Sequence, residues 1–324
     1  MTIGVGVIGT GVMGAEHARL LRTETPGAHL AGVFDSDASR AKAAAGGGVV
    51  FADPQALIAS DKIDAVVVAS PDATHAGLAL ACLEAGKPVL CEKPLAATTA
   101  EALRIVEAEA SLGRRWIQVG YMRRFDAGYQ EMKRIGDEGV IGATVLLHNV
   151  HRNARAPAWF TGAMAVTNSF VHEIDISRWL TGSEMVSARV EAGPGGDPLM
   201  ITMRTDRDAI VSTEVYLNAA YGYHVHAELV GRAGTVALAP PALTTLHRAG
   251  AGGLAYPDNW VPRFADAYRR QIAAWIGAAK TGDAVGASAW DGYVASALAE
   301  QIAAAMTEGR EAKLRCEARP PLYA

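Results

Sequence analysis

Three glycines near the N-terminus have the spacing of a loop that binds a dinucleotide phosphate. Gly9-Thr10-Gly11-Val12-Met13-Gly14 fits the pattern G-x-G-x-x-G and lies between a short apolar run and an amphipathic segment. The first glycine permits a tight turn, the second lets the backbone approach a pyrophosphate, and the third lets the next helix pack closely. Because the pattern alone is unspecific, its position between a predicted strand and a predicted helix makes it informative.

An acidic residue further on indicates which nucleotide fits. Asp35 ends the second apolar run, about 20 residues after the last glycine of the loop. A carboxylate there accepts both ribose hydroxyls and repels a 2′-phosphate, so it favours NAD over NADP. Ser36 stands where an NADP enzyme would place arginine, but the nearby Arg40 leaves dual use of NAD and NADP open.

Two further clusters could complete the oxidation of an alcohol, which needs a base for the hydroxyl proton and a cation for the oxygen. Lys93, in Cys91-Glu92-Lys93-Pro94, follows a predicted strand at the sheet edge where open α/β folds bind ligands. The alternative for Lys93 is an ordinary surface lysine. Arg123 and Arg124 lie at the predicted domain junction, and we favour Arg123 for the site and an ordinary ion pair for the other.

A third cluster lies on a predicted helix in the second half of the chain. Offsets of four and three residues bring Asn168, His172 and Asp175 to one face of a regular helix. The alternative, of about equal weight, is that this stripe is the wet side of an amphipathic helix.

The first half of the chain must position the glycine loop. Its continuous apolar runs predict strands buried on both faces, as in a parallel sheet covered by helices. The expected strands are Ile3–Gly9, Leu30–Asp35, Val49–Ala52, Ala65–Ser70, Pro88–Cys91 and Trp116–Val119, and the expected helices are Val12–Leu21, Asp37–Ala45, Ala73–Ala85 and Ala100–Leu112. This order predicts an N-terminal Rossmann domain, a doubly wound α/β sheet, over residues 1–121.

The second half, residues 122–324, has a different pattern. Segments such as AIVSTEVYL and HVHAELV tend to alternate apolar and polar residues, as half-buried antiparallel strands do. The expected strands are Ala143–His151, Met185–Ala192, Leu199–Arg204, Ala209–Leu217, Tyr223–Val230 and Thr235–Leu238, and the expected helices are Ala127–Glu138, Ser169–Leu180, Arg263–Ala279 and Ala289–Thr307. We therefore expect an α+β domain with an open, largely antiparallel sheet, and a loose segment around Ala249–Gly253.

Length and composition fit this division. A chain of 324 residues predicts two domains, and a net charge of −4 argues against a nucleic-acid partner. No apolar run is long enough for a membrane span. Three widely spaced cysteines offer neither a zinc pattern nor a disulfide framework, which suits a cytoplasmic protein.

Together these motifs resemble the glucose-fructose oxidoreductase and inositol dehydrogenase family (Gfo/Idh/MocA) over essentially the whole chain. The resemblance is carried by GTGVMG, Asp35, Ala69-Ser-Pro-Asp-Ala-Thr-His75, Glu92-Lys-Pro94 and His172-Glu-Ile-Asp175. Within the family, Gly120-Tyr-Met-Arg-Arg-Phe-Asp126, His151-Arg-Asn153 and Tyr221-Gly-Tyr223 are most similar to the enzymes that oxidise myo-inositol at carbon 2.

The resemblance implies an NAD-dependent dehydrogenase that oxidises a secondary hydroxyl of a cyclitol, with myo-inositol first, to the ketone. Lys93 would hold the reacting oxygen, and His172 would be the general base. The ring hydroxyls would be bound by Arg123, His151, Asn153, Asp175 and Tyr223. The cofactor contacts expected from the glycine loop and from the resemblance are Gly9, Gly11, Val12, Met13, Gly14, Asp35, Ser36, Arg40, Ser70, Asp72, His75, Glu92, Lys93 and Met122.

One position departs from the family pattern. Many relatives carry aspartate four residues before the histidine, whereas this chain has Asn168. An amide can orient an imidazole, but it cannot supply the negative charge that stabilises an imidazolium. We therefore expect His172 to titrate lower here than in relatives with aspartate.

Other functions stay open from the sequence. The substrate could instead be another inositol isomer, an aminocyclitol or a pyranose, or the chain could be a catalytically silent NAD-binding sensor. A metal-dependent dehydrogenase is a third option, although His148, His151, His224 and His226 have no cysteine partner, and we expect no metal. Apolar residues along 209–230 predict that the second sheet forms a homotetramer or dimer.

Overall fold

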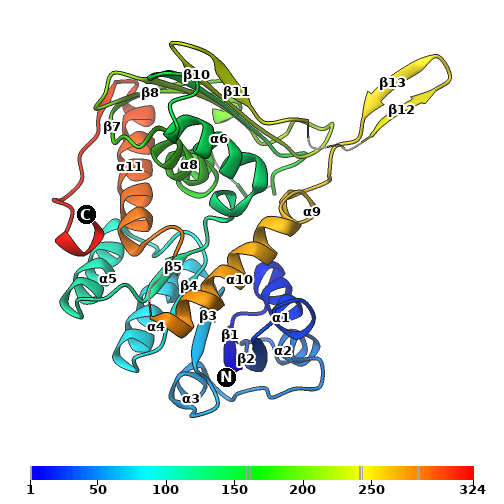
Figure 1. Cartoon of the computed structure of the whole chain (residues 1–324), viewed down its shortest axis with the longest axis vertical. Coiled ribbons are helices and arrows are strands. Elements are labelled where there is room, and N and C mark those ends of the chain that lie inside the picture. The colour runs from blue at the N-terminus through cyan, green and yellow to red at the C-terminus, as the bar shows by residue number, and fades with distance from the viewer. Residues whose placement is uncertain (1, 158, 161, 241, 243, 283–284) are drawn as a thin grey trace. The chain divides into compact units, whose positions relative to one another are not determined.

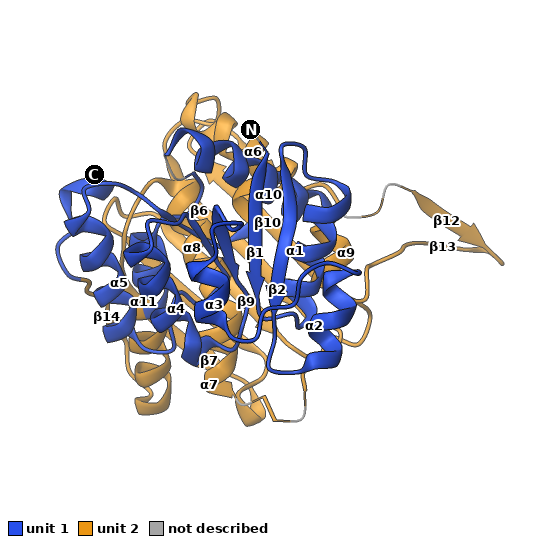
Figure 2. Ribbon diagram, turned by 90° about the horizontal axis from the view of Figure 1, so that it is seen from below, with its two compact units in different colours: residues 1–122, 266–296, 317–324 blue, residues 123–265, 297–316 orange. Residues whose placement is uncertain are grey.

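Figure 1 shows a computed structural model of the chain that describes residues 2–157, 159–160, 162–240, 242, 244–282 and 285–324. The chain forms two compact units, coloured in Figure 2. Unit 1 contains residues 1–122, 266–296 and 317–324, and unit 2 contains residues 123–265 and 297–316. Two segments of the expected second domain thus group with unit 1, and the division after residue 121 stays a prediction. None of the described helices has both the length and the apolarity to cross a membrane.

Unit 1 is built on a five-stranded parallel sheet in the order β2-β1-β3-β4-β5. Its strands are β1 (Ile3–Ile8), β2 (Ala28–Phe34), β3 (Ala65–Val68), β4 (Val89–Cys91) and β5 (Ile117–Val119). Its helices are α1 (Val12–Thr23), α2 (Ala38–Ala45), α3 (Pro54–Ala59), α4 (Asp72–Glu84), α5 (Thr99–Ser111), most of α10 (Ala265–Thr281) and the first part of α11 (Ala289–Glu308). Every residue of β1, β3, β4 and β5 is buried, which confirms the predicted doubly wound sheet covered by helices.

The predicted strand Val49–Ala52 is wrong. The segment touches β2 through a single bridge between Val33 and Val50. The backbone bonds there are Val33 N to Val49 O, 3.0 Å, and Phe51 N to Val33 O, 2.8 Å. The chain turns away at once because Asp53 caps the unpredicted helix α3, accepting from the amide of Ala56 at 2.7 Å.

The end of the chain completes unit 1. Glu109 on α5 is buried, and its Oε1 accepts hydrogen bonds from the amides of Trp116 and Ile117, both at 2.6 Å. Tyr323, in the short 3-10 helix Pro321–Tyr323, donates its hydroxyl to Oε2 at 2.5 Å. Glu109 therefore connects the start of β5 to the C-terminal segment.

Unit 2 contains a seven-stranded sheet in the order β11-β10-β6-β9-β8-β7-β14. Its strands are β6 (Thr144–Arg152), β7 (Met185–Ala192), β8 (Leu199–Thr205), β9 (Ile210–Tyr216), β10 (His224–Gly231), β11 (Thr235–Ala237) and β14 (Ala312–Lys313). Among the described strands of this sheet only β6 and β9 pair in parallel, so the predicted open, largely antiparallel sheet is confirmed. Buried residues alternate along β8, β9 and β10, and α8 (Val171–Thr181) packs against β6 and against α6 (Ala127–Asp137).

Two expectations for unit 2 are corrected. The segment expected to be loose around Ala249–Gly253 is part of a hairpin, β12 (Thr245–Arg248) paired with β13 (Ala251–Leu254), followed by the short helix α9 (Trp260–Arg263). Ala249 and Gly250 have φ angles of 51° and 77°, as a tight two-residue hairpin turn requires.

The predicted regular helix Ser169–Leu180 starts instead as a π-helical segment, Ala165–Phe170, and becomes α-helical at Val171. The offset of four residues between Asn168 and His172 therefore spans the change from π-helical to α-helical geometry.

Candidate functional site

The carboxyl ends of β1, β2 and β3 surround a pocket of about 460 Å³ in unit 1. It is lined by Ile8, Gly9, Phe34, Asp35, Ser36, Arg40, Pro54, Gln55, Ser70, Pro71, Thr74, Gly77 and Leu78. Open α/β sheets bind their ligands at this edge, and the volume suits a nucleoside. Five of the predicted cofactor residues line this pocket: Gly9, Asp35, Ser36, Arg40 and Ser70.

The glycine loop beside the pocket fits a dinucleotide. Gly9 has φ of 86°, and a Cβ there would lie 2.4 Å from the amide nitrogen of Ser70. A Cβ on Gly14 would lie 1.8 Å from the carbonyl oxygen of Gly9, so the third glycine is needed for packing. A Cβ on Gly11 would meet nothing within 4 Å. This open space beside the second glycine lies where a pyrophosphate would approach the backbone.

Asp35 connects the glycine loop to the pocket. Its Oδ2 accepts from the amide and hydroxyl of Thr10, at 2.6 and 3.0 Å. Its Oδ1 accepts from the amide of Asp37 at 2.8 Å and from Arg40 at 2.9 Å. Burial alone would raise the pKa of Asp35, but these donors, Arg40 first, hold it well below its usual range. The carboxylate is therefore ionised and able to accept ribose hydroxyls.

The loop that carries Lys93 is held by its neighbour Glu92. Glu92 follows β4, is buried, and has its Oε1 2.7 Å from Nε2 of the buried His17 on α1. Its Oε2 lies 3.3 Å from the amide of Lys93 and would be 2.7 Å from a Cβ on Gly120. Glu92 thus fits against a glycine on one side and an imidazole on the other, while Lys93 stays partly exposed.

His75 holds the same loop from the other side. It is buried on α4, with Nδ1 2.7 Å from the carbonyl oxygen of Pro94 and Nε2 2.8 Å from that of Ser70. Carbonyl oxygens only accept, so both ring nitrogens donate when both bonds are made, as they do in an imidazolium. Burial by itself would lower the pKa of His75, but Cys91 and these two carbonyl groups raise it to about 10.

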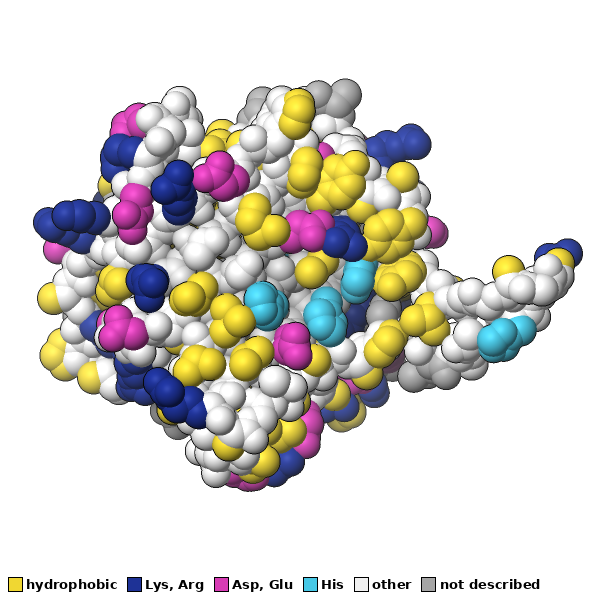
Figure 3. Space-filling view, turned by 90° about the horizontal axis from the view of Figure 1, so that it is seen from above, with side chains coloured by type: hydrophobic (Ala, Val, Ile, Leu, Met, Phe, Trp, Pro, Cys, Tyr) yellow, Lys and Arg dark blue, Asp and Glu magenta, His cyan; other side chains and the backbone are white. Residues whose placement is uncertain are grey.

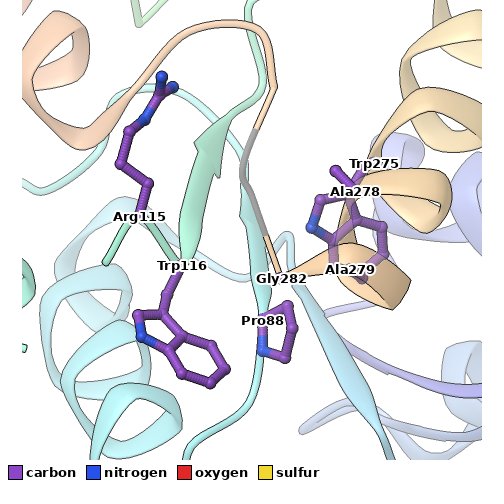
Figure 4. A pocket seen from close by; sticks show the side chains of 7 residues that line it. All are labelled: Pro88, Arg115, Trp116, Trp275, Ala278, Ala279 and Gly282. Atoms are coloured by element: carbon purple, nitrogen blue, oxygen red, sulfur yellow. The ribbon is translucent and has the colours of Figure 1, made fainter. Parts of the chain in front are cut away.

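A second, much smaller pocket in unit 1 is not a ligand site. Figure 4 shows it between Pro88, Trp116 and the helix residues Trp275, Ala278 and Ala279. Its volume is about 10 Å³, room for one water at most. The indole nitrogen of Trp275 is buried and has no hydrogen-bond partner among the described residues, which suits such a water.

Unit 2 brings together four of the predicted substrate and base residues. His151 lies at the end of β6, with its ring 6.5 Å from that of His172 and 6.0 Å from that of Tyr223, between centroids. The buried Arg123 forms an ion pair with Glu173, next to His172 on α8. Glu173 also lies 3.0 Å from Nδ1 of His151.

The remaining predicted residues of unit 2 have other partners. Asp175 binds Arg124 through both carboxylate oxygens, at 3.0 and 2.5 Å. Both arginines thus form ion pairs, although an ion pair was expected for Arg124 alone. The backbone N–H of Asn153 donates to the backbone carbonyl oxygen of Tyr216 at 2.9 Å. Its side-chain Oδ1 is buried and has no hydrogen-bond partner among the described residues. Such an acceptor is costly to bury unless a ligand hydroxyl supplies the bond.

Sequence reasoning missed two groups of residues. Pro54 and Gln55 line the nucleotide pocket from α3, a helix too short and too weakly patterned to be expected. Glu173 lies within the His172-Glu-Ile-Asp175 motif, but the sequence assigns it no role, because a glutamate on a helix is usually solvated. No cluster of three or more metal-ligating His, Cys, Asp or Glu side chains occurs in the part of the chain that the structure describes.

Two family patterns match the chain. Residues 3–121 match the oxidoreductase family with an NAD-binding Rossmann fold, GFO_IDH_MocA, and residues 129–237 match the GFO/IDH/MocA C-terminal domain. The chain belongs to the Gfo/Idh/MocA oxidoreductase family.

Relatives within this family are similar over their whole length. Inositol 2-dehydrogenase 1 of Saccharopolyspora erythraea is 50% identical, covering 100% of this chain and 99% of that protein. Inositol 2-dehydrogenase of Paracoccus denitrificans is 39% identical, with 100% of both covered. The crystal structure of myo-inositol dehydrogenase from Lactobacillus casei in complex with NAD(H) and myo-inositol has a TM-score of 0.95 and 32% identity, covering 100% of both chains. Scyllo-inositol dehydrogenase from the same organism, with NAD(H) and scyllo-inositol, has a TM-score of 0.87 and 25% identity over 97% of this chain and 99% of that one.

Proposed function

We propose that the protein is an NAD-dependent dehydrogenase that oxidises a secondary hydroxyl of a cyclitol, with myo-inositol first, to the ketone. The full-length similarity to the Lactobacillus casei enzyme bound to NAD(H) and myo-inositol carries this proposal. The nucleotide pocket supports it independently, because the ionised Asp35 suits the ribose of NAD and repels a 2′-phosphate.

In the proposed reaction the substrate carbon that bears the secondary hydroxyl becomes a carbonyl carbon. His172 takes the hydroxyl proton, and the ammonium of Lys93 stabilises the negative charge that develops on the oxygen. The hydride leaves the same carbon for the nicotinamide ring, which is the chemistry that the bound cofactor supplies. Asn168 is the residue proposed to orient His172.

The remaining site residues bind and orient. The ring hydroxyls are assigned to Arg123, His151, Asn153, Asp175 and Tyr223. Cofactor contacts beyond those that line the pocket are assigned to Gly11, Val12, Met13, Gly14, Asp72, His75, Glu92, Lys93 and Met122. Several buried polar side chains would each hydrogen-bond a ring hydroxyl. We expect strong discrimination between stereoisomers, because a buried polar group without a partner costs free energy.

The test is an activity screen. Formation of NADH is followed by absorbance with myo-inositol, other inositol isomers, an aminocyclitol and hexoses, with Lys93→Ala as the inactive control. We expect turnover with myo-inositol and loss of at least about 100-fold in Lys93→Ala, the usual contribution of an acid–base or charge-stabilising group. Preference for another isomer, an aminocyclitol or a pyranose would change the substrate but keep the chemistry. Silence with every compound, with NAD binding confirmed by calorimetry, would instead favour a sensor.

We further propose that the outer face of the unit 2 sheet joins copies of the chain into a homotetramer or dimer. Figure 3 shows histidine side chains gathered among hydrophobic ones on one face of the molecule. By strand register, Met200, Glu214, Val150 and His226 form one row across four adjacent strands of the sheet. Met200 is 45% exposed, which is unusual for a central strand of a sheet that meets only water. A monomer by light scattering at micromolar concentration would refute this proposal.

The proposed location is the cytoplasm. Cys82 and Cys91 are buried free thiols, as in a reducing compartment. Cell fractionation with an antibody against the chain would test this.

A further inference from the structure

We propose that Glu173 and Arg123 act as positioning residues that fix the tautomer of the His151 imidazole, so that its Nε2 presents a lone pair to a substrate hydroxyl. The inference rests on the proposed function, because the contact between His151 and a hydroxyl belongs to it. It assigns to Glu173 a role in recognition, and it moves Arg123 from a hydroxyl-binding residue to a buried counter-ion.

The first step is the tautomer of His151. Its Nδ1 lies 3.0 Å from Oε2 of Glu173, and neither residue is more than 4% exposed. Burial alone would raise the pKa of Glu173, but the guanidinium of Arg123, the largest opposing influence, holds it below its ordinary value, so Glu173 is a carboxylate. A carboxylate only accepts hydrogen bonds. The proton of the pair must therefore be on Nδ1 of His151.

The second step is the role of Arg123. Its Nη2 lies 3.4 Å from the same Nδ1, but a guanidinium only donates and cannot bond to a nitrogen that carries a proton. The shorter contact with the carboxylate decides the tautomer. Arg123 is instead paired with Glu173 and is only 2% exposed.

The third step is the charge of His151. With Glu173 ionised and Arg123 protonated, the buried pair is neutral, and an imidazolium would add an uncompensated positive charge. Among the described residues, Tyr129 from α6 and Tyr223, beside β10, interact with this pair, and Arg263 interacts with both tyrosines. Burial raises the pKa of both tyrosines. The imidazole ring of His172 on α8 also lies beside that of His151. Neither tyrosine supplies a negative charge at neutral pH, so neither offsets a positive charge on the ring of His151.

The consequence is directional recognition. A neutral imidazole with its proton on Nδ1 has a lone pair on Nε2, and it accepts a hydrogen bond but cannot donate one. A substrate hydroxyl that meets His151 must therefore donate its proton in the hydrogen bond. A carbonyl, ether or fluorine substituent at that ring position only accepts, so the site rejects it. This carboxylate–imidazole pair is at His151, whereas the base His172 follows Asn168 in place of the usual aspartate.

The direct test is ¹⁵N NMR of the histidine side chains in the full-length protein. His151 is assigned by comparison with His151→Gln. At pH 8 we expect a protonated Nδ1 and an unprotonated Nε2. A proton on Nε2 at this pH would overturn the proposal. This result is independent of turnover, so it is distinguishable from failure of the proposed function, which would appear as absence of NADH formation with every cyclitol.

The kinetic test uses Glu173→Gln, whose amide can donate to Nδ1 and so release the other tautomer. We expect KM for the cyclitol to rise by about 10- to 100-fold, as for one mismatched buried hydrogen bond, with KM for NAD unchanged. The matched control is Glu131→Gln, which removes the carboxylate of an exposed arginine pair on α6. If Glu173→Gln changes KM for NAD and for the cyclitol equally, the role of Glu173 is structural and the proposal fails. Where Glu173→Gln does not fold, the spectrum of the wild type decides.

Discussion

Nε2 of His17 lies 2.7 Å from Oε1 of Glu92, and both side chains are buried in unit 1. The pair connects the helix after the glycine loop to the residue before Lys93. The cofactor loop and the proposed catalytic lysine are thereby held by one hydrogen bond.

Replacing His17 with phenylalanine would keep a ring of similar size against Tyr268, whose centroid is 6.0 Å away, but would remove the donor to Glu92. We expect the free energy of unfolding to fall by about 1–3 kcal/mol, the cost of an unsatisfied buried group. Turnover should fall as well, because Lys93 loses its support. Chemical denaturation and steady-state kinetics measure both effects. His17→Gln, which keeps a donor, is the rescue variant, and equal stability of His17→Phe and wild type would contradict this prediction.

Replacing Asp35 with serine should change the choice of cofactor. The variant loses two hydrogen bonds to the ribose and the repulsion of a 2′-phosphate, so kcat/KM for NAD should fall by about 10- to 100-fold. Arg40, which pairs with Asp35 at 2.9 Å, is then available to a phosphate, so activity with NADP should rise. Asp37→Asn is the matched control, because asparagine caps α2 as well as aspartate does. An unchanged ratio of the two cofactors would remove Asp35 from this role.

Stability should depend on pH through His75. Its pKa is raised from 6.5 to about 10 in the folded protein, so the folded state binds one more proton than the unfolded state between these values. The stabilisation is complete below pH 6.5 and is lost as the pH rises toward 10, by up to about 1.4 kcal/mol per pH unit. Denaturant titrations from pH 6.5 to 9.5 measure this slope. His75→Gln should flatten it and the exposed His29→Gln should not, and identical slopes in all three proteins would exclude His75 as the source.

Replacing Asn168 with aspartate should shift the pH profile of the reaction. A carboxylate near His172 favours its imidazolium and raises its pKa. Because the base must be neutral, the acidic limb of kcat/KM should move to higher pH, by about one unit. Asn168→Ala should leave the limb in place. Coinciding limbs in wild type and Asn168→Asp would show that residue 168 does not tune the base.

Replacing Met200 with lysine should weaken the proposed association of subunits. The new charge would stand in the middle of the exposed sheet face, where a subunit interface would desolvate it. Multi-angle light scattering should report a smaller species than for wild type. Val140→Lys, at a position 63% exposed outside the sheet, is the control. An unchanged mass for Met200→Lys would place any interface elsewhere.

Sequence patterns predict the elements of this chain where burial decides them. The all-apolar run at Ala65–Val68 predicts a strand buried on both faces, and the alternation along Ile210–Tyr216 predicts a strand buried on one face. The structure contains both kinds of strand at these positions. The segment around Val50 was misread because one bridge and a strand look alike in a short apolar run. The hairpin at 245–254 has no buried face, so its sequence lacks the alternation of apolar and polar residues that would predict strands.

The candidate site was predictable in its residue types and not in its pairings. The glycine loop and Asp35 are recognised by spacing, because phosphate and ribose chemistry demand those residues. The partner of each charged side chain depends on tertiary packing. Arg123 and Arg124 are adjacent in sequence, yet they pair with Glu173 and Asp175 respectively. The π-helical turn before His172 has no local sequence signature, so the sequence predicts a regular helix there.

The bond between Tyr323 and Glu109 makes the last turn of the chain part of the nucleotide-binding fold. Burial raises the pKa of Glu109, and the tyrosine hydroxyl is one of the donors that offset this effect. Proteolytic removal of Tyr323 would therefore leave the buried carboxyl group of Glu109, at the start of β5, without one of its hydrogen-bond donors.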